Sequence, residues 1–339
     1  MGQENMKIFY VTNINNKHSY TKSIAKWLRL YGHKVHMFEM YGFNDSPRYQ
    51  NPLIPPIHQM NNDFVVQCLR FKPDVLLVFK GDTIFKDSLT IIKRKIRPLM
   101  ATWWVDDPFI RWDGGGNIHP FTNTLASLYL WDYFFIYETY TLQRLKRIGV
   151  KNPYYLPNAT DTDYFHTLRK NDAKDKYYYG ADISFIGTPD RLRAEMIRAL
   201  NNQQIKLWGP PWRDSYYQEK HVKSNLNAKE VCKVYHYTKI NLNRHFMVNV
   251  TGANVRTFDI PACEGFLLTD DMADITNILY EKDREVVTYK NMRDLQNKVK
   301  YFLKHDRERK DIAKNARKKT IAKHLYKHRV KELLEIINQ

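Results

Sequence analysis

Short apolar runs alternate with amphipathic stretches along most of the chain. An apolar run bounded by polar residues predicts a buried strand, and apolar residues spaced three and four apart predict a helix that packs on the sheet. In the first half, we predict strands at residues 7–12, 34–39, 75–79, 99–103, 134–137 and 154–156. We predict helices at residues 19–31, 60–71, 88–95 and 139–148. Strands that alternate with helices indicate a parallel, doubly wound α/β sheet.

The same alternation begins again after residues 157–179, a polar, lysine-rich stretch without clear periodicity. Beyond it we predict strands at residues 182–186, 205–208, 240–242 and 266–269, and helices at residues 191–200, 231–237 and 254–263. From Asn291 onward the pattern is almost entirely helical. We therefore predict a first domain, a linker, a second domain and a closing helix, at residues 1–157, 158–180, 181–322 and 323–339.

The composition is that of a folded globular protein, with 43% hydrophobic and 27% charged residues. No apolar run approaches the roughly 18 residues of a membrane-spanning helix, and the first residues are too polar for a signal peptide. We therefore expect a cytoplasmic protein without a transmembrane segment. The three cysteines, Cys68, Cys232 and Cys263, are too scattered for a disulfide framework or a cysteine zinc site, so we expect them to be reduced and buried.

The formal net charge of +18 is the unusual feature of the composition. Such an excess favours anionic partners, which include nucleotide diphosphates, phosphate-rich polymers, anionic lipid headgroups and nucleic acid. Much of the charge lies in residues 307–331, where lysine and arginine dominate a helical pattern. We favour a solvated helix face over a dedicated nucleic-acid site there, because basic residues alone give affinity without specificity.

One stretch, Thr251 to Asp270, predicts a loop, a short helix and a buried strand in succession. The start of a helix carries backbone N–H groups that bind anions well. Arg256 in the first turn opposes the helix dipole, which is reasonable if a diphosphate supplies the opposite charge. One turn later, Asp259 can accept hydrogen bonds from ribose hydroxyls. An ordinary amphipathic helix with a solvated arginine and aspartate explains the spacing equally well.

This stretch resembles the signature of the CgeB/YkvP spore-maturation glycosyltransferase-like family. That signature reads Asn, Arg-Thr-Phe-Glu, Ala-Cys-Gly-Gly and an apolar strand that ends in Thr-Asp. The matching residues here are Asn254, Arg256-Thr257-Phe258-Asp259, Ala262-Cys263-Glu264-Gly265 and Thr269-Asp270. The resemblance covers about residues 180–337 and is loose in the first half. Two residues depart from the pattern: Asp259 replaces a glutamate, and Glu264 replaces a glycine.

The resemblance implies the GT-B fold, in which two Rossmann-like domains face each other and the last helix crosses back to the first. It implies a hexosyltransferase-like enzyme that takes a sugar from a nucleotide-sugar co-substrate, such as a UDP-hexose or another NDP-hexose, without a cofactor or a metal ion. The donor site would lie in the second domain, at Gly187, Trp208, Gly209, Lys239, Arg244, Asn254, Arg256 and Asp259. Without the resemblance, Gly187 is as well explained by a plain turn and Trp208 by the core. We favour Arg256 as the diphosphate ligand over Lys239 and Arg244.

The acceptor would bind in the first domain, where Trp103-Trp104-Val105-Asp106-Asp107-Pro108 follows a predicted strand. Indole faces stack on sugar rings, and a carboxylate can act as general base on an acceptor hydroxyl. Asp106 is our first choice of base, followed by Asp107, with His18 as the other candidate. The alternative interpretation is an aromatic core followed by a capping aspartate.

Several other motifs carry less weight. Asp161-Thr162-Asp163 resembles a metal-binding motif but lies in the predicted linker, and we expect no metal there. Gly114-Gly115-Gly116 lacks the following Lys-Ser/Thr pair of a phosphate-binding loop, and residues 13–18 lack the glycine pattern of an NAD enzyme.

Two other classes of function stay open. One is a nucleic-acid- or polyanion-binding protein with a degenerate or DNA-directed sugar-transfer site, and the other is a non-catalytic nucleotide-binding scaffold. The acceptor is open as well: a glycan, a protein, an anionic polymer or nucleic acid, with peripheral contact to a membrane surface as a further option.

Overall fold

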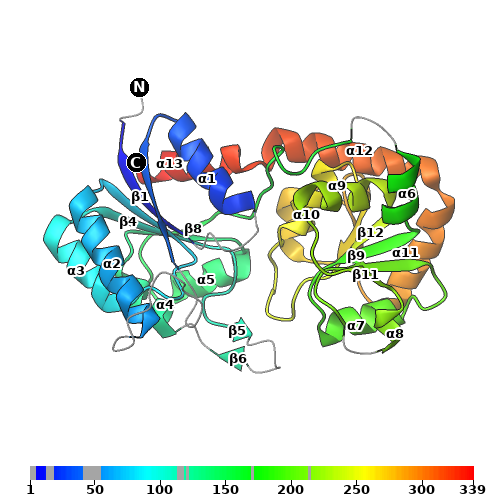
Figure 1. The fold of residues 1–339 in the computed structure, drawn as a ribbon, viewed down its shortest axis with the longest axis horizontal. Coiled ribbons are helices and arrows are strands. Elements are labelled where there is room, and N and C mark those ends of the chain that lie inside the picture. The colour runs from blue at the N-terminus through cyan, green and yellow to red at the C-terminus, as the bar shows by residue number, and fades with distance from the viewer. Residues whose placement is uncertain are drawn as a thin grey trace. The chain divides into compact units, whose positions relative to one another are not determined.

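The computed structural model of the chain describes residues 5–12, 19–40, 55–112, 118–119, 122–168, 172–212 and 215–339. It divides into two compact units, one formed by residues 1–157 and 326–339 and the other by residues 158–325 (Figure 1). Each unit contains a six-stranded parallel sheet with helices packed against it. The predicted parallel, doubly wound α/β architecture is therefore confirmed.

The first unit is built around the strand order β2-β1-β3-β4-β7-β8. The strands are β1 Lys7–Thr12, β2 Lys34–Glu39, β3 Val75–Phe79, β4 Leu99–Trp104, β7 Tyr133–Ile136 and β8 Pro153–Tyr155, with a separate antiparallel pair β5 Arg111–Trp112 and β6 Ile118–His119. The helices are α1 Ser19–Leu30, α2 Pro56–Phe71, α3 Lys86–Ile96, α4 Thr122–Ser127, η1 Leu128–Leu130 and α5 Thr139–Arg147. All five residues of β3 are buried, which explains why this strand is uniformly apolar.

The closing helix α13, Tyr326–Ile337, belongs to this first unit and packs against α1. The Tyr31 hydroxyl donates a hydrogen bond to the Lys327 carbonyl at 3.0 Å. The Arg329 Nε donates to the Pro157 carbonyl at 3.1 Å. The last helix is thus held to the first unit by two side-chain-to-backbone bonds as well as by its buried apolar face.

The second unit has the strand order β11-β10-β9-β12-β13-β14. The strands are β9 Ile183–Ile186, β10 Ile205–Trp208, β11 His221–Lys223, β12 Ile240–Asn243, β13 Leu267–Asp270 and β14 Val287–Tyr289. The helices are α6 Ala173–Tyr179, α7 Arg191–Arg198, α8 Ser215–Gln218, α9 Ala228–Tyr237, α10 Arg256–Ala262, the π-helix Ile275–Leu279, α11 Met292–Lys304 and α12 Asp306–Lys323. Helix α10 packs against α12, so the predicted signature stretch is covered by the basic helix.

The stretch that we read as a linker contains a helix, α6, which corrects that part of the sequence interpretation. Asp172 caps it, because its carboxylate accepts hydrogen bonds from the backbone N–H groups of Lys174 and Asp175. The helix is only seven residues long, and of these Tyr179 alone is buried. Two turns with one buried residue give too weak a period to detect in the sequence.

Two of the three cysteines lie against each other in the core of the second unit. All three are free and buried. Cys232 on α9 and Cys263 at the end of α10 have their sulfur atoms 3.3 Å apart. Cys68 lies on α2 of the first unit. Within the described parts of the chain, no helix has both the length and the apolarity needed to cross a bilayer.

The backbone conformation at the end of α10 suits the glycine that the family signature has where this chain has Glu264. Glu264 has a φ of 59°, in the left-handed region that disfavours residues with a Cβ atom. Its carboxylate lies 3.8 Å from the Arg317 Nε in a partly exposed ion pair, and such pairs contribute little to stability. Glu264 therefore holds a strained backbone conformation at the end of the helix, and its ion pair with Arg317 offsets little of that strain.

We expect Glu264→Gly to raise the free energy of unfolding by about 1 kcal/mol, because the left-handed conformation is unstrained for glycine. Chemical denaturation of the two proteins measures the difference. Glu264→Ala is the matched control, since it removes the same carboxylate but keeps the Cβ atom. Equal stability of the glycine and alanine variants would show that the backbone conformation is not the cause.

Candidate functional site

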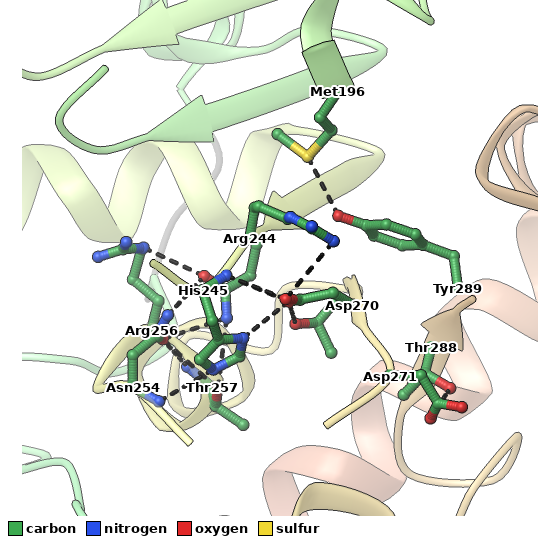
Figure 2. Close-up of polar contacts among 12 residues, drawn as sticks. Met196, Arg244, His245, Asn254, Arg256, Thr257, Asp270, Asp271, Thr288 and Tyr289 are labelled. Atoms are coloured by element: carbon green, nitrogen blue, oxygen red, sulfur yellow. Dashed lines mark hydrogen bonds and ion pairs between the residues drawn. The ribbon is translucent and has the colours of Figure 1, made fainter. Parts of the chain in front are cut away.

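Polar side chains converge in the second unit where β12 ends and α10 begins. Asn243, the last residue of β12, exchanges two hydrogen bonds with Asn254 through their amide groups, at 3.1 and 3.0 Å. The Arg256 Nε donates to the Asn243 Oδ1 at 3.3 Å. Figure 2 shows Asn254 and Arg256 side by side at this point. The paired amides therefore hold the Arg256 side chain at the carboxyl edge of the sheet, where open α/β sheets bind ligands.

The Arg256 side chain is half-buried. Burial lowers its pKa, although Tyr235 and Asp259 act in the opposite direction. Among the residues that the structure describes, no carboxylate forms an ion pair with it. A Cβ atom on Gly187 would lie 3.4 Å from the Arg256 Nη2, so the absence of a side chain on Gly187 leaves that end of the guanidinium accessible. The arrangement suits an anionic ligand.

A second arginine, Arg193, lies close to Arg256 and is fully buried. Arg193 donates hydrogen bonds to the Arg244 carbonyl at 3.2 and 3.0 Å and to the Thr188 carbonyl at 2.7 Å. It pairs with Asp190 at 3.2 Å and lies over the Phe246 ring at 3.7 Å. Burial, followed by the charge of Arg256, lowers the pKa of Arg193 to about 9. A bound anion would relieve the repulsion between these two cations.

Two glycines leave room at the neighbouring strand ends. Gly209, just after β10, has a φ of 102°, and a Cβ atom there would lie 3.2 to 3.4 Å from the backbone of Gly187. The Gly187 N–H donates to the Trp208 carbonyl at 3.0 Å. The structure thus brings together five of the predicted donor-site residues, namely Gly187, Gly209, Arg244, Asn254 and Arg256.

Two other predicted donor residues are not part of this cluster. Lys239 precedes β12 whereas Arg244 follows it, so Lys239 lies at the opposite edge of the sheet, where it pairs with Asp182 at 2.7 Å. Trp208 is fully buried and stacks on Tyr179, with ring centroids 5.8 Å apart. Trp208 is therefore a core residue and offers no face to a nucleobase.

Asp259 has a different environment from the one that we expected. Its Oδ1 accepts a hydrogen bond from the Thr160 Oγ1 at 2.6 Å, and the residue is buried. Burial raises the pKa of Asp259 to about 8, even though the Thr160 hydrogen bond opposes the change. Asp259 therefore binds Thr160 within the core and presents little surface to a ribose hydroxyl.

The start of α10 also differs from the predicted row of free N–H groups. The N–H groups of Thr257, Phe258 and Asp259 already donate to the carbonyls of Asn254 and Val255. The helix is only seven residues long, so its dipole is small. The positive charge of this site therefore comes from the arginine side chains.

Comparison with known proteins relates part of the chain to a known family. Residues 191–335 match a family described as glycosyl transferase-like. The spore protein CgeB of Bacillus subtilis (strain 168) is 24% identical, over 74% of this chain and 78% of CgeB. The chain is therefore similar to CgeB, and its residues 191–335 form a glycosyl transferase-like region. The resemblance predicted from the signature stretch is thereby confirmed.

Solved structures show the fold of this chain. Sucrose-phosphate synthase from Thermosynechococcus elongatus has a TM-score of 0.73 and 12% identity, with 99% of both chains covered. Anabaena HepE, crystallised in complex with UDP-glucose, has a TM-score of 0.68 and 11% identity, over 98% of this chain and 100% of HepE. The predicted GT-B fold is confirmed.

The tryptophans that we predicted for the acceptor side of the CgeB-like chain are core residues. Trp103 and Trp104 on β4 are both buried. The Trp103 Nε1 donates to the Leu156 carbonyl at 3.1 Å, and its ring packs on Phe79 and Tyr326. Because β4 is a central strand with both faces covered, successive residues are buried alike. Neither indole is free to stack on a sugar.

The candidate bases differ in accessibility. Asp106 is partly exposed and forms an ion pair with Lys80. Asp107 is fully buried; it accepts a hydrogen bond from the Phe109 N–H at 2.8 Å and lies 3.4 Å from the Arg144 Nη1. His18 and the triple glycine at residues 114–116 lie outside the described residues. The structure thus shows one accessible carboxylate beside one buried carboxylate.

Burial raises the pKa of Asp107 from 3.8 to about 6, with Glu138 adding to the effect and Phe109 and Arg144 opposing it. A raised carboxyl pKa favours folding at low pH, and this contribution is lost as the pH rises through about 6. Relative to Asp107→Asn, the wild-type protein should lose about 2 kcal/mol of unfolding free energy between pH 4 and pH 7, because each pKa unit corresponds to about 1.36 kcal/mol and part of the change lies below pH 4. Denaturation of both proteins across this range measures it. A difference that is constant with pH would contradict the assignment.

Three further residues of the CgeB-like site were missed from the sequence. Asn243 ends β12, His245 follows it, and Asp270 ends β13. The His245 Nδ1 lies 2.7 Å from the Asp270 Oδ1. Their positions at or just after strand ends were the available signal, because ligands bind at the carboxyl ends of parallel strands.

The acidic linker motif forms a local turn. The Asp161 Oδ1 accepts a hydrogen bond from the Asp163 N–H at 2.9 Å. Within the described part of the chain, no three His, Cys, Asp or Glu side chains are grouped in a way that would hold a metal ion.

Proposed function

We propose that the second unit binds a nucleotide-sugar donor through its diphosphate, and that the enzyme transfers the sugar to an acceptor hydroxyl. The observation that carries this proposal is the Arg256 guanidinium, which is held by Asn243 beside Gly187 and has no carboxylate partner among the described residues. A guanidinium of this kind binds a diphosphate through two parallel hydrogen bonds.

The same group would act in the reaction. As the bond between sugar and diphosphate breaks, negative charge develops on the leaving diphosphate, and an oriented guanidinium stabilises that charge without reorganising. Arg193 adds to the local positive potential. We propose that these side chains supply the charge that a divalent cation provides in other transferases, since two nearby guanidinium groups disfavour a bound cation.

A UDP-hexose is the first donor to test. HepE, which has the same fold, was crystallised in complex with UDP-glucose. Gly187 and Gly209 leave the neighbouring strand ends without side chains, so that a nucleotide can approach the backbone. With Trp208 buried, the nucleobase would contact this backbone and not an indole ring.

On the acceptor side, we retain Asp106 and Asp107 as proposed general bases of an inverting reaction. Asp106 is accessible, although its pairing with Lys80 must loosen for it to take a proton. Asp107 would have to leave the Phe109 N–H and Arg144 before it could reach a hydroxyl. Asp106 is therefore the better candidate.

An exposed basic face on α12 supports an anionic acceptor. Lys310, Lys314 and Lys318 follow one another at one-turn spacing, and all three are exposed. Lys310 pairs with Asp306 at 2.6 Å, while the structure gives Lys314 and Lys318 no carboxylate partner among the described residues. This face would attract a phosphate-rich or otherwise anionic acceptor.

A nucleotide-sugar screen by thermal shift and donor hydrolysis, with EDTA present, tests the proposal. A ligand that binds only the folded protein raises its melting temperature. We expect a shift with one donor that is unaffected by EDTA and is lost in Arg256→Ala. If no donor shifts the melting temperature, donor binding is refuted, and salt-dependent binding of a polyanion becomes the leading alternative.

A further inference from the structure

His245 is buried between the end of β12 and the loop that leads to α10. Its Nδ1 lies 2.7 Å from the Asp270 Oδ1. Its Nε2 lies 3.1 Å from the backbone nitrogen of Asn254. Figure 2 shows the imidazole between Asp270 and Asn254, with Arg244 on the other side of the Asp270 carboxylate.

These two contacts define one proton arrangement for the ring. The Asn254 N–H can only donate, so the Nε2 must carry no proton and accept this hydrogen bond. Asp270 accepts from the backbone N–H of His245, at 3.2 Å to both oxygens, and lies 3.7 Å from the Arg244 Nη1. Burial acts to raise the pKa of Asp270, but His245 and Arg244 together hold it below its usual value. An ionised Asp270 requires the proton to be on the Nδ1.

The contacts continue from His245 to the arginine that carries the proposed function. His245 holds the backbone of Asn254, and the Asn254 amide pairs with Asn243. The Asn243 Oδ1 then accepts from the Arg256 Nε. Within the described residues this is an unbroken series of hydrogen bonds from Asp270 to Arg256.

We propose that His245 is a positioning residue: as a neutral imidazole with its proton held on the Nδ1 by Asp270, it fixes Asn254 and, through the Asn254–Asn243 amide pair, aims the Arg256 guanidinium at the donor diphosphate. This inference rests on the function proposed above. The competing explanation is that His245 only fills space in the core.

Three substitutions separate positioning from space filling. His245→Gln keeps an acceptor near the position of the Nε2 but loses the donor to Asp270. His245→Asn keeps the donor and loses the acceptor for the Asn254 N–H. Asp270→Asn removes the negative charge that favours a proton on the Nδ1, and its amide can present either an oxygen or an NH2 group to the ring. Space filling predicts a larger loss for the smaller asparagine at position 245, but no effect of the isosteric Asp270→Asn on the tautomer of His245.

Nuclear magnetic resonance of the full chain without ligand tests the inference independently of sugar transfer. We expect the ¹⁵N shifts of His245, identified as the imidazole signals lost in His245→Gln, to show the Nδ1–H tautomer. We expect Asp270→Asn to weaken the preference for this tautomer. We also expect the Arg256 Nε–H signal to persist in His245→Gln and to broaden by exchange in His245→Asn. An Nε2–H tautomer or an imidazolium in the wild-type protein at neutral pH would overturn the proposal.

Binding of UDP-glucose tests the link to the donor. We expect His245→Asn to weaken binding by about 10- to 30-fold and His245→Gln by less than about 3-fold, in line with the loss of one buried hydrogen bond. Equal losses in both variants, each folded by its melting curve, would refute positioning. If the wild-type protein binds no donor at all, the proposed function and its link to His245 both fail. The resonance experiment then still decides whether Asp270 sets the tautomer.

Discussion

The Arg256→Ala variant is expected to lose about 100- to 1,000-fold in kcat/KM for sugar transfer, the range found when one oriented group is removed from a developing negative charge. Arg256 is held by Asn243, and no carboxylate among the described residues neutralises it. Its charge is therefore available to a ligand. Steady-state kinetics with the donor found in the screen measure the loss. Turnover at the wild-type rate would exclude Arg256 from the reaction.

Two control variants sharpen this test. Arg256→Lys keeps the charge but not the planar pair of donors, so we expect it to recover only part of the activity. Arg191→Ala removes an arginine of the same unit whose side chain is 75% exposed and pairs with Glu195. We expect the activity of Arg191→Ala to be unchanged, because exposed pairs contribute little. A similar loss in Arg191→Ala would indicate a general effect of net charge.

The Gly265→Ala variant is expected to lower the free energy of unfolding by about 2–3 kcal/mol, which is typical of overpacking in a rigid core. The added Cβ atom would lie 2.8 Å from both the Asn241 Nδ2 and the Tyr235 carbonyl oxygen. Asn241 has little freedom to move, since it donates to Tyr235 at 3.0 Å and accepts from the Ser184 hydroxyl at 2.9 Å. Chemical denaturation measures the loss.

Gly149→Ala serves as the control for this prediction. Gly149 has a φ of 74°, but a Cβ atom there would have nothing within 4 Å. That variant should lose about 1 kcal/mol, from backbone strain alone. If Gly265→Ala is no less stable than Gly149→Ala, Asn241 and Tyr235 are able to move aside.

The predicted strands were accurate where an apolar run ends sharply in polar residues. The predicted bounds of β1, β2, β3 and β10 agree with the structure at every residue. Helix α6 was missed because only one of its seven residues is buried. The pair β5 and β6 was missed because each strand has only two residues, too few to show any alternation.

The site was predictable only in part, for a different reason. The family signature located Arg256 and Asn254, and a glycine after a buried strand located Gly187. Aromatic residues on central strands misled us, because a sequence does not distinguish an indole that packs in a core from one that faces a ligand. The sequence already argued against Lys239 as a donor residue. It precedes its strand, and only residues that follow a parallel strand lie at the carboxyl edge of the sheet. His245 follows β12 and Asp270 ends β13, so only the folded sheet brings these two residues into contact.

The buried cysteines allow the opening of each unit to be followed separately by the rate of thiol modification. Cys232 and Cys263 touch across α9 and α10, so a thiol reagent can reach them only when this part of the second unit opens. Cys68 on α2 reports in the same way on the first unit. A donor that binds beside α10 should therefore slow the labelling of the cysteine pair while it leaves Cys68 unaffected. The rate of thiol modification would then show which unit has engaged its ligand, before any product is formed.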